Sequence, residues 1–339
     1  MSGMRVRVVI PCRDEAGYIG RCLRSLIDAD RAGMDLEAWV CDGMSGDGTR
    51  EEIRVLAAAH PWIRLVDNPA RTTPQAMNLG LKPSGYDIGI LLGAHAEVEP
   101  GFLRASLACL EAHPEAGCVG GIIENVCTDA WSRRIAAAMS HPFGVGGAHF
   151  RTGRKAGEVD TVAFGAYRRE ALAAVGFVDE RLARNQDDEL NFRLVKAGWR
   201  IVLDPAIRSR YHVRASLRRL YRQYWQYGYW KVYVNRLHGT VTTLRQLVPA
   251  AFMAFVLGGA ALAWTHPLMA IGYAAGIALY LIAATASAAA AARRISDAPG
   301  VLAAIATLHT AYGLGYLRGL IDFLLLRREP KAKAAASSR

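Results

Sequence analysis

Short apolar runs alternate with helical patterns over the first part of the chain. The strand-like runs, rich in Val and Ile, fall at residues 6–10, 37–41, 63–66, 88–92 and 118–123. Between them, apolar residues recur at helical spacing. This alternation is typical of a parallel sheet with crossover helices. We therefore predict an α/β fold with a Rossmann-like, mostly parallel sheet.

Two of the predicted helices carry recognisable start signals. Thr49, with Glu52 three residues later, fits a capping box, in which two side chains satisfy the first backbone N–H groups. Thr73 followed by Pro74 fits the N-cap and first turn of a further helix. The sequence therefore predicts helices that begin near residues 49 and 73.

Long apolar stretches dominate the C-terminal part of the chain. Residues 249–264 and 267–292 are long enough to span a membrane and predict a helical hairpin with both ends cytoplasmic. A third stretch, 301–326, contains charged residues and is either a span or a re-entrant or interfacial segment. We predict a membrane module over 246–328 and a disordered tail of Ala, Lys and Ser over 329–339.

The charge of the chain is positive and unevenly placed. There are 41 Lys and Arg against 30 Asp and Glu, a net charge of +11. Much of the positive charge falls within 208–245, where Tyr and Trp are interleaved with it, as at a membrane surface. Membrane lipids are therefore favoured over nucleic acid as a partner. We predict a catalytic domain over 1–210 and an amphipathic interfacial helix region over 211–245.

The first residues and the cysteines both indicate a cytosolic body. Residues 1–7 lead straight into a β-like run and not into the longer apolar stretch of a secretory signal. The six cysteines include no CxxC pair, and several lie in apolar runs, as small core residues of a reducing compartment do. We expect them to be free thiols.

The loops that follow the predicted strands carry most of the polar candidates. In open α/β sheets, ligands bind at the carboxyl ends of the strands. The loops at 11–16, 42–49, 67–71 and 93–96 should therefore surround one crevice.

The first two loops lie in the segments VVIPCRDEAGYI and WVCDGMSGDGT. Together with the motifs described below, they resemble the family 2 glycosyltransferases of the GT-A fold, in particular the bacterial exopolysaccharide enzymes. The resemblance extends from residue 6 to about residue 231. It implies an inverting hexosyltransferase that moves a sugar from a nucleotide diphosphate, with UDP favoured, to a lipid-linked or growing glycan acceptor.

In that family the first strand and its loop hold the nucleotide, which implies donor contacts for Pro11, Arg13 and Glu15. Asp42, at the end of the second strand, would accept a hydrogen bond from the uracil ring, because a carboxylate can accept from an imide N–H. Asp47, in the same loop, either contributes to the site or belongs to a Gly and Asp turn that caps the next helix.

The segment NPARTTPQAMNLGL resembles the part of the family that faces the nucleotide and its phosphates. Arg71 either supplies positive charge to the diphosphate or is simply solvated. Asn78 is expected to order the loop.

The end of the fourth predicted strand departs from the family's pattern. A DxD motif usually holds Mg²⁺ or Mn²⁺ there, whereas this chain has Gly93, Ala94 and His95. The resemblance implies donor contacts for Ala94 and His95. Because His is a better ligand for Mn²⁺ than for Mg²⁺, we expect a weakly held divalent cation, Mn²⁺ rather than Mg²⁺, on His95 with Glu97 or Glu99, or none.

An acidic run carries the acceptor-side motif. The sequence QDDEL from residue 186, followed by Arg193, matches the family's motif with Gln in place of the first Glu. Asp187 aligns with the catalytic base, which takes the proton of the acceptor hydroxyl as its oxygen attacks the anomeric carbon. Asp188, the less favoured base, and Arg168 are acceptor-side candidates. Alternatively, the acidic residues only stabilise the start of a helix.

Two further segments resemble parts of the family that lie near the membrane. SHPFGVGGAHFR looks like an acceptor-side loop in which His141, His149 and Arg151 could contact a lipid phosphate, although Gly-rich loops with His are common. LRRLYRQYWQYGYWK resembles a helix that closes over the donor diphosphate, which makes Gln223 a candidate. The alternative is a purely interfacial helix, and both roles could hold together.

We thus expect a multi-pass protein of the bacterial inner membrane, with a cytoplasmic catalytic domain and a polyprenyl-diphosphate-linked acceptor. Gly93 keeps open a catalytically inactive membrane partner that binds nucleotide sugar or glycan, although Asp42 and Asp187 speak against it. A nucleotidyltransferase is disfavoured because PCRDEA is not a Gly-rich basic phosphate loop. A transporter is disfavoured because the apolar region is too short to enclose a path.

Overall fold

The computed structural model describes residues 3–153, 156–213, 215–242 and 244–330, which divide into two compact units. Of the described residues, the first unit comprises 3–126 and 149–212, and the second comprises 127–148 and 213–330. The predicted boundary at residue 210 did not foresee that 127–148 groups with the C-terminal part. The predicted tail from residue 331 onward lies outside the described residues.

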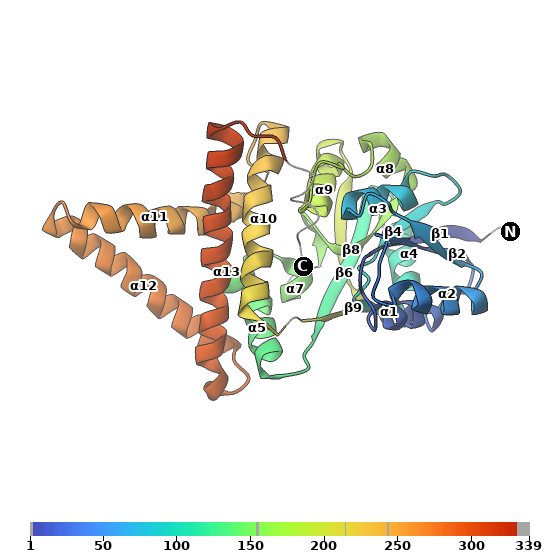
Figure 1. Cartoon of the computed structure of the whole chain (residues 1–339), viewed down its shortest axis with the longest axis horizontal. Coiled ribbons are helices and arrows are strands. Elements are labelled where there is room, and N and C mark those ends of the chain that lie inside the picture. The colour runs from blue at the N-terminus through green and yellow to red at the C-terminus, as the bar shows by residue number, and fades with distance from the viewer. Residues whose placement is uncertain (1–2, 154–155, 214, 243, 331–339) are drawn as a thin grey trace. The chain divides into compact units, whose positions relative to one another are not determined.

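The described part of the first unit holds a mixed sheet of nine strands in the order β3-β2-β1-β4-β8-β6-β9-β5, with β7 paired to β9 (Figure 1). The strands are β1 (Met4–Cys12), β2 (Met34–Asp42), β3 (Ile63–Asp67), β4 (Ile88–Leu91), β5 (Ala96–Val98), β6 (Ala116–Val126), β7 (Gly157–Glu158), β8 (Ala163–Arg168) and β9 (Arg200–His212).

The sheet is parallel in one half and mixed in the other. β3, β2, β1 and β4 run parallel, as predicted. β8 is antiparallel to both β4 and β6, and β5 and β7 are antiparallel to β9. Because β6 is antiparallel to β8 and parallel to β9, six of the nine strands run in the same direction, and only β5, β7 and β8 of the described strands run the opposite way. The expectation of a mostly parallel sheet is therefore confirmed, with the antiparallel strands confined to the second half.

Helices cover both faces of the sheet. They are α1 (Ile19–Ile27), α2 (Thr49–Ala59), α3 (Thr73–Leu81), α4 (Phe102–Ala112), α7 (His149–Thr152), α8 (Arg169–Val175) and α9 (Gln186–Lys196). Along β1, Val8 and Ile10 enter the core beneath α1, α2 and α4, whereas Val9 enters the core beneath α3, α8 and α9. Both faces of β1 are thus buried, as its continuous apolar run predicts.

The predicted capping box at the start of α2 is wrong. The N-cap is Gly48, with a φ of 94°, and no side chain caps it. The Glu52 carboxylate instead accepts hydrogen bonds from the backbone N–H groups of Gly17 at 2.7 Å and Gly20 at 3.2 Å. This tertiary contact to the loop after β1 takes the place of the predicted capping box. The other predicted helix start is at the expected position, since α3 begins at Thr73 with Pro74 in its first turn.

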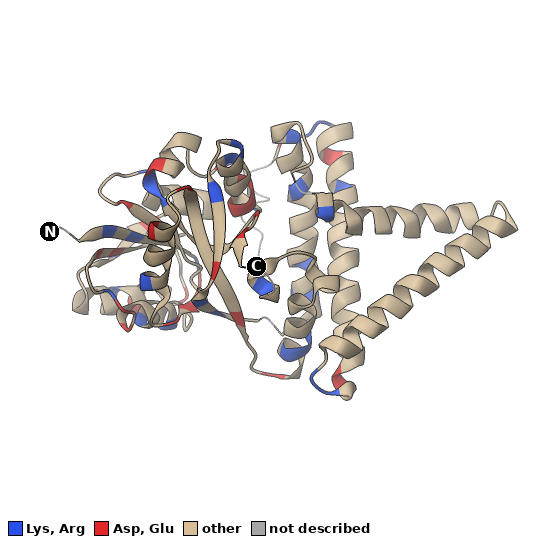
Figure 2. Cartoon of the chain, turned by 180° about the vertical axis from the view of Figure 1, so that it is seen from behind, with Lys and Arg blue, Asp and Glu red and all other residues tan. Residues whose placement is uncertain are grey.

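The second unit is helical. It contains α5 (Ala130–Ser140), α6 (Pro142–Val145), α10 (Leu217–His238), α11 (Val248–Ala263), α12 (Pro267–Ala291) and α13 (Ala298–Gly319), which continues as a π-helical turn (Leu320–Leu325). Three of its helical segments, Leu244–Ala263, Pro267–Ala291 and Ile295–Leu325, are long and apolar enough to cross a membrane. Figure 2 shows α11 and α12 free of Lys, Arg, Asp and Glu.

Glycines let α10 and α13 pack backbone to backbone, and Figure 1 shows the two helices side by side. A Cβ atom on Gly315 would lie 2.1 Å from the Trp225 carbonyl oxygen, and one on Gly228 would lie 2.1 Å from the Tyr312 carbonyl oxygen. Small residues at a helix interface allow this close approach.

A methyl group at this interface should destabilise the second unit. Gly315→Ala must push α10 away from α13, and overpacking of this kind costs about 1–3 kcal/mol. Gly272→Ala is the matched control, because nothing lies within 4 Å of a Cβ on this α12 glycine. Thermal unfolding in detergent should show a lower midpoint for Gly315→Ala only. Equal midpoints for the two variants would contradict the packing described.

The cysteines should differ in reactivity. Cys12, Cys22, Cys41, Cys109 and Cys118 are buried free thiols, whereas Cys127 is half-buried. Burial raises the pKa of Cys41 to about 12 and that of Cys109 to about 11. Because the thiolate is the reactive form, maleimide should label Cys127 first and the other five only on unfolding. Mass spectrometry of the native protein and of Cys127→Ser tests this, and fast labelling of the Cys127→Ser variant would count against it.

Candidate functional site

Unusual backbone conformations mark the carboxyl edge of the parallel strands. Asp14, Met44 and Arg71, in the loops after β1, β2 and β3, have left-handed φ values of 46°, 59° and 61°. Phe164, with a φ of 49°, lies against Gly93, which follows β4. Such conformations cluster at active sites. The edge at which open α/β sheets bind ligands is therefore also the strained edge of this sheet.

The loops after β1 and β2 are joined by hydrogen bonds. The Glu15 N–H donates to Thr49 Oγ1 at 2.8 Å, and the Ala16 N–H donates to Asp47 Oδ2 at 3.2 Å. Although burial opposes it, hydrogen bonds from Thr49 and Ala16 hold the pKa of the Asp47 carboxyl below its usual value. These contacts favour the structural interpretation of Asp47.

Asp42 is fully buried at the end of β2. Its carboxylate accepts from the Ser45 hydroxyl at 2.5 Å, from the Ser45 N–H at 3.0 Å and from Arg50 Nη1 at 2.7 Å. Arg50 also donates to Asp67 Oδ1 at 2.7 Å and so links the ends of β2 and β3. A carboxylate has about four acceptor positions, so these three bonds leave one of them unused, although no part of the residue is exposed in this structure.

Pro11 and Arg13 lie at the end of β1, beside that carboxylate. Pro11 is opposite Cys41 in the parallel register of β1 and β2. The side chain of Arg13 covers Gly43, since a Cβ atom there would lie 3.1 Å from Arg13 Cδ. The glycine after Asp42 therefore makes room for the Arg13 side chain at the strand ends.

Two candidate residues of the segment after β3 differ in exposure. Arg71 is exposed beyond the end of β3. Asn78, on α3, donates to the Val178 carbonyl at 2.9 Å and to Glu180 Oε1 at 2.7 Å, and accepts from the Val178 N–H at 3.1 Å. Asn78 therefore fixes residues 178–180, and not the loop after β3 that it was expected to order.

His95 follows β4 and faces the loop after β1. Its Nδ1 atom lies 3.7 Å from Glu15 Oε1, and it is buried without a hydrogen-bond partner. Its ring contacts the edge of the Tyr211 ring, with 5.1 Å between ring centres. Ala94, beside it, is buried. The strand order thus brings Glu15 and His95 together, as predicted for the crevice.

The ligands for a divalent cation are few. Within the described ranges, no three His, Cys, Asp or Glu side chains gather to hold a metal ion. Glu97 is hydrogen-bonded to His212 Nε2 at 2.6 Å, and Glu99 pairs with Arg210 at 2.7 Å. The two carboxylates expected to complete the site are therefore engaged elsewhere. His95 and Glu15 remain as a two-residue set, which diphosphate oxygens would have to complete.

Asp187 lies exposed in the first turn of α9, after Asn185 in a left-handed conformation with a φ of 62°. Its Oδ1 atom accepts the backbone N–H of Asp188 at 2.9 Å, and the helix N-terminus stabilises its charged form. Asn191, one turn further on, accepts from the Tyr167 hydroxyl at 3.2 Å and so ties α9 to β8.

Two other charged members of this acidic motif, Glu189 and Arg193, are structural. Glu189 is buried and forms two hydrogen bonds of 2.7 Å with Arg193. Arg193 also donates to the carbonyls of Val175 and Phe177, at the end of α8. The pair fixes the start of α9 and thereby the position of Asp187.

Arg168 does not reach this edge, which corrects the sequence-based expectation. Because β8 is antiparallel to β4, Arg168 lies opposite Ile88 at the amino end of β4. It donates to the carbonyls of Ala116 at 2.9 Å and Leu110 at 2.6 Å.

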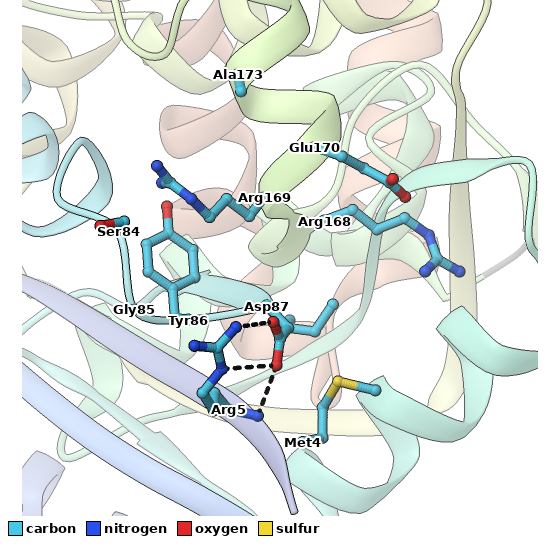
Figure 3. A pocket seen from close by; sticks show the side chains of 11 residues that line it. Met4, Arg5, Ser84, Gly85, Tyr86, Asp87, Arg168, Arg169, Glu170 and Ala173 are labelled. Carbon is cyan, nitrogen blue, oxygen red and sulfur yellow. Dashed lines mark hydrogen bonds and ion pairs between the residues drawn. The ribbon is translucent and has the colours of Figure 1, made fainter. Parts of the chain in front are cut away.

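A pocket opens at the same amino edge. It has a volume of about 740 Å³, and Figure 3 shows Arg168 and Arg169 around it, with Arg5 paired to Asp87. Since ligands of such sheets bind at the carboxyl edge, this pocket is not the donor site.

Gln223 and His141 belong to the second unit. Gln223 Nε2, on α10, donates to the Tyr227 hydroxyl at 2.9 Å. His141 Nδ1 accepts from the Phe143 N–H at 3.2 Å and caps α6. Their roles toward a substrate stay predictions.

Comparison with known proteins agrees with the fold and the motifs. The sequence pattern of the family described as Glycosyl transferase family 2 matches residues 7–176. The chain belongs to this family. Family 2 glycosyltransferases act on nucleotide sugars in glycan synthesis, and transfer with inversion is typical of them.

Two relatives of this glycosyltransferase are matched by it over most of their length. Succinoglycan biosynthesis protein ExoA of Rhizobium meliloti (strain 1021) is 30% identical over 328 residues, 93% of this chain and 95% of the relative. The dolichyl N-acetyl-alpha-D-glucosaminyl phosphate 3-beta-D-2,3-diacetamido-2,3-dideoxy-beta-D-glucuronosyltransferase of Methanococcus voltae is 28% identical over 230 residues, 66% of this chain and 71% of the relative.

Solved structures confirm the GT-A fold. Mannosyltransferase PcManGT from Pyrobaculum calidifontis, in complex with GDP-Man and Mn²⁺, superposes with a TM-score of 0.56 at 20% identity, covering 90% of this chain and 87% of that one. S. aureus TarS 1–349 superposes with a TM-score of 0.51 at 14% identity, covering 93% and 90%.

The positions of Tyr211 and His212 at the candidate site of this glycosyltransferase were not predicted from the sequence. They lie at the end of β9, which pairs with β5 so that Ala96 is opposite Tyr211. This pairing brings Tyr211 beside His95 and His212 beside Glu97. β5 has only three residues, so no local pattern could reveal the pairing.

Proposed function

We propose that the protein transfers a sugar, with inversion, from a UDP-linked donor onto a polyprenyl-diphosphate-linked glycan at the cytoplasmic face of a bacterial inner membrane. The observation that carries the donor site is the strained carboxyl edge of β1, β2 and β4. It gathers Asp42, Arg13, Glu15 and His95 on loops that buried hydrogen bonds hold in place.

Each donor-side residue has a task that its chemistry allows. Asp42, with one acceptor position left, takes the imide N–H of the base. Pro11 and Arg13 line the nucleotide, and Arg71, exposed after β3, offers its guanidinium to the diphosphate. Ala94 leaves room beside His95, and Gln223 is a further proposed donor contact.

Asp187 is the proposed base. Its exposed carboxylate takes the proton of the acceptor hydroxyl while the hydroxyl oxygen bonds to the anomeric carbon. The bond from that carbon to the diphosphate breaks on the opposite side, and its electron pair leaves with the diphosphate oxygen. Attack opposite the leaving group inverts the configuration. Asp188 and His141 are proposed acceptor-side contacts.

A divalent cation, when bound, supplies positive charge to the diphosphate. His95 and Glu15 would hold it, and a nitrogen and carboxylate pair suits Mn²⁺ better than Mg²⁺. The presence of Mn²⁺ in the PcManGT complex supports a cation at a site of this fold.

The acceptor and the location rest on the second unit and the relatives. Three helices long and apolar enough to cross a membrane would hold the enzyme beside a lipid-linked acceptor. The name of the Methanococcus voltae relative describes a lipid-phosphate-linked sugar as its acceptor, which supports one here.

The acceptor class can be tested in membranes. Vesicles containing the protein, incubated with radiolabelled UDP-sugars and a lipid-linked glycan extract, should yield label that partitions into organic solvent. Mild acid, which cleaves polyprenyl diphosphates, should release the label as a water-soluble glycan. Label that appears only in water-soluble product before acid treatment would exclude the lipid-linked acceptor while leaving sugar transfer intact.

A further inference from the structure

Three basic side chains of the first unit have a buried nitrogen with no hydrogen-bond partner among the described residues. These atoms are Nδ1 of His95, Nδ1 of His149 and Nη1 of Arg151. Buried polar atoms are nearly always paired in native proteins, so each unpaired one needs an explanation. A ligand with acceptor oxygens would explain such nitrogens where two of them lie close together.

Tyr211 lies beside two of these side chains. The His95 ring meets its edge, and the Arg151 guanidinium carbon lies 5.7 Å from the centre of its ring. Arg151 is also 5.5 Å from the Phe150 ring, which packs against one of the cores of the unit. Both side chains are therefore held close to one ring at the carboxyl edge.

Arg151 is held by aromatic faces and not by a carboxylate. In the part of the chain that the structure describes, no Asp or Glu pairs with it. Aromatic stacking restrains the plane of a guanidinium but leaves its N–H groups available, and these match the oxygens of a phosphate in pairs. Arg151 thus has the form of an anion-binding residue.

The balance of charged side chains at the carboxyl edge of the sheet also indicates an anion-binding site. Gly93 stands where a carboxylate could help to hold a cation, and a Cβ atom there would lie 3.3 Å from Phe164 Cε1. Glu97 and Glu99 are engaged by His212 and Arg210. The site therefore has fewer carboxylates for a cation than a DxD site and an unpaired guanidinium in addition.

We propose that Arg151, next to His95, binds the diphosphate of the donor and neutralises the charge that develops on it as the sugar leaves. This rests on the proposed function, because it names residues of the same site. A guanidinium fixed before the reaction stabilises a leaving anion as a metal ion does. The requirement for a divalent cation is correspondingly weak, and Arg151 serves the donor and not the phosphate of the lipid acceptor.

Binding measurements on the full chain in detergent test the proposal without turnover. UDP, uridine and farnesyl phosphate are titrated by calorimetry, once with Mn²⁺ and once with EDTA. Arg151→Gln should weaken UDP binding in EDTA by about 10- to 100-fold, the effect expected for losing charge-assisted hydrogen bonds. Uridine lacks phosphate, so its affinity for Arg151→Gln should equal its affinity for the wild type. Arg151→Lys should recover part of the loss.

Arg31→Gln is the matched control. Arg31 also stacks on an aromatic ring, with its guanidinium carbon 4.8 Å from the centre of Trp62, but it precedes β2 at the amino edge. Its UDP affinity should equal that of the wild type. The wild type should also bind UDP in EDTA within about tenfold of its affinity in Mn²⁺, whereas Arg151→Gln should depend more strongly on Mn²⁺.

Different failures have different meanings. Equal UDP affinity of Arg151→Gln and wild type in EDTA would overturn the role of Arg151 and leave the proposed function standing. Loss of farnesyl phosphate binding with UDP binding unchanged would move Arg151 to the acceptor and overturn the donor assignment. Absence of UDP binding in the wild type, with or without Mn²⁺, would overturn the proposed function and this inference with it.

Discussion

Asp187→Asn should lower the turnover number by about 10²- to 10⁴-fold, the range that a general base contributes. An Asn side chain keeps the oxygen that accepts the Asp188 N–H at 2.9 Å but cannot take a proton from the acceptor hydroxyl. Because residue 187 is exposed in the first turn of α9, the variant should fold normally. Steady-state kinetics of nucleotide release measure the effect.

Asp188→Asn is the matched control for this substitution. It removes the same charge from the same turn, and turnover should fall by less than about tenfold because the base itself remains and only the local field and one acceptor-side contact change. Affinity for UDP should be unchanged in both variants. A fall in turnover confined to Asp188→Asn would assign the base to Asp188.

Arg193→Leu should destabilise the first unit by about 3–5 kcal/mol, the cost of removing one partner of a buried ion pair. The substitution leaves the Glu189 carboxylate buried without its guanidinium and removes the donor from the carbonyls of Val175 and Phe177. Thermal unfolding in detergent should show a midpoint lower by roughly 10 °C.

Arg54→Ala provides the comparison. Arg54 pairs with Glu51 on the surface of α2, where both side chains are exposed, and such pairs contribute at most about 1 kcal/mol. Its unfolding midpoint should be close to that of the wild type. If Arg193→Leu unfolded at the same temperature as Arg54→Ala, the α8–α9 junction would not depend on the buried pair.

Where the sequence predicted the fold, the pattern was local. The central part of β1 and the whole of β4 are buried on both faces, so each shows as a continuous apolar run. β5, β8 and β9 were not predicted, for different reasons. β5 has three residues, β8 includes Gly165, and the outer part of β9 alternates charged residues with buried ones. Their partners are distant in sequence, so only the folded chain selects them.

The site residues likewise divide into those that a local sequence pattern could place and those that depend on contacts between distant segments. Asp42 and His95 could be placed because they follow predicted parallel strands, whose carboxyl ends share an edge. Arg168 was misplaced because the direction of β8 cannot be read from its sequence, and an antiparallel strand delivers its last residue to the opposite edge. Tyr211 and the contacts of Arg151 depend on long-range pairing and had no local signal.

The local signals also failed where a tertiary contact competed. Thr49 and Glu52 have capping-box spacing, yet Glu52 binds the backbone of the loop after β1. Likewise, 127–148 reads as part of a continuous catalytic domain, although in the structure it groups with the second unit. There His309, on α13, binds the Phe143 carbonyl at 2.7 Å, and Arg134 pairs with Asp297 at 2.8 Å. Contacts between segments so distant in sequence leave no trace in either segment alone.

The most direct test of the account is nucleotide release by the purified, detergent-solubilised chain across a panel of UDP- and GDP-sugars, with and without a lipid-linked glycan extract. We expect that one UDP-sugar supports release, that release requires the extract, and that Asp187→Asn lowers it by at least about 10²-fold. Silence with every donor, although UDP still binds, would contradict transfer and indicate a partner that binds nucleotide sugar without turnover.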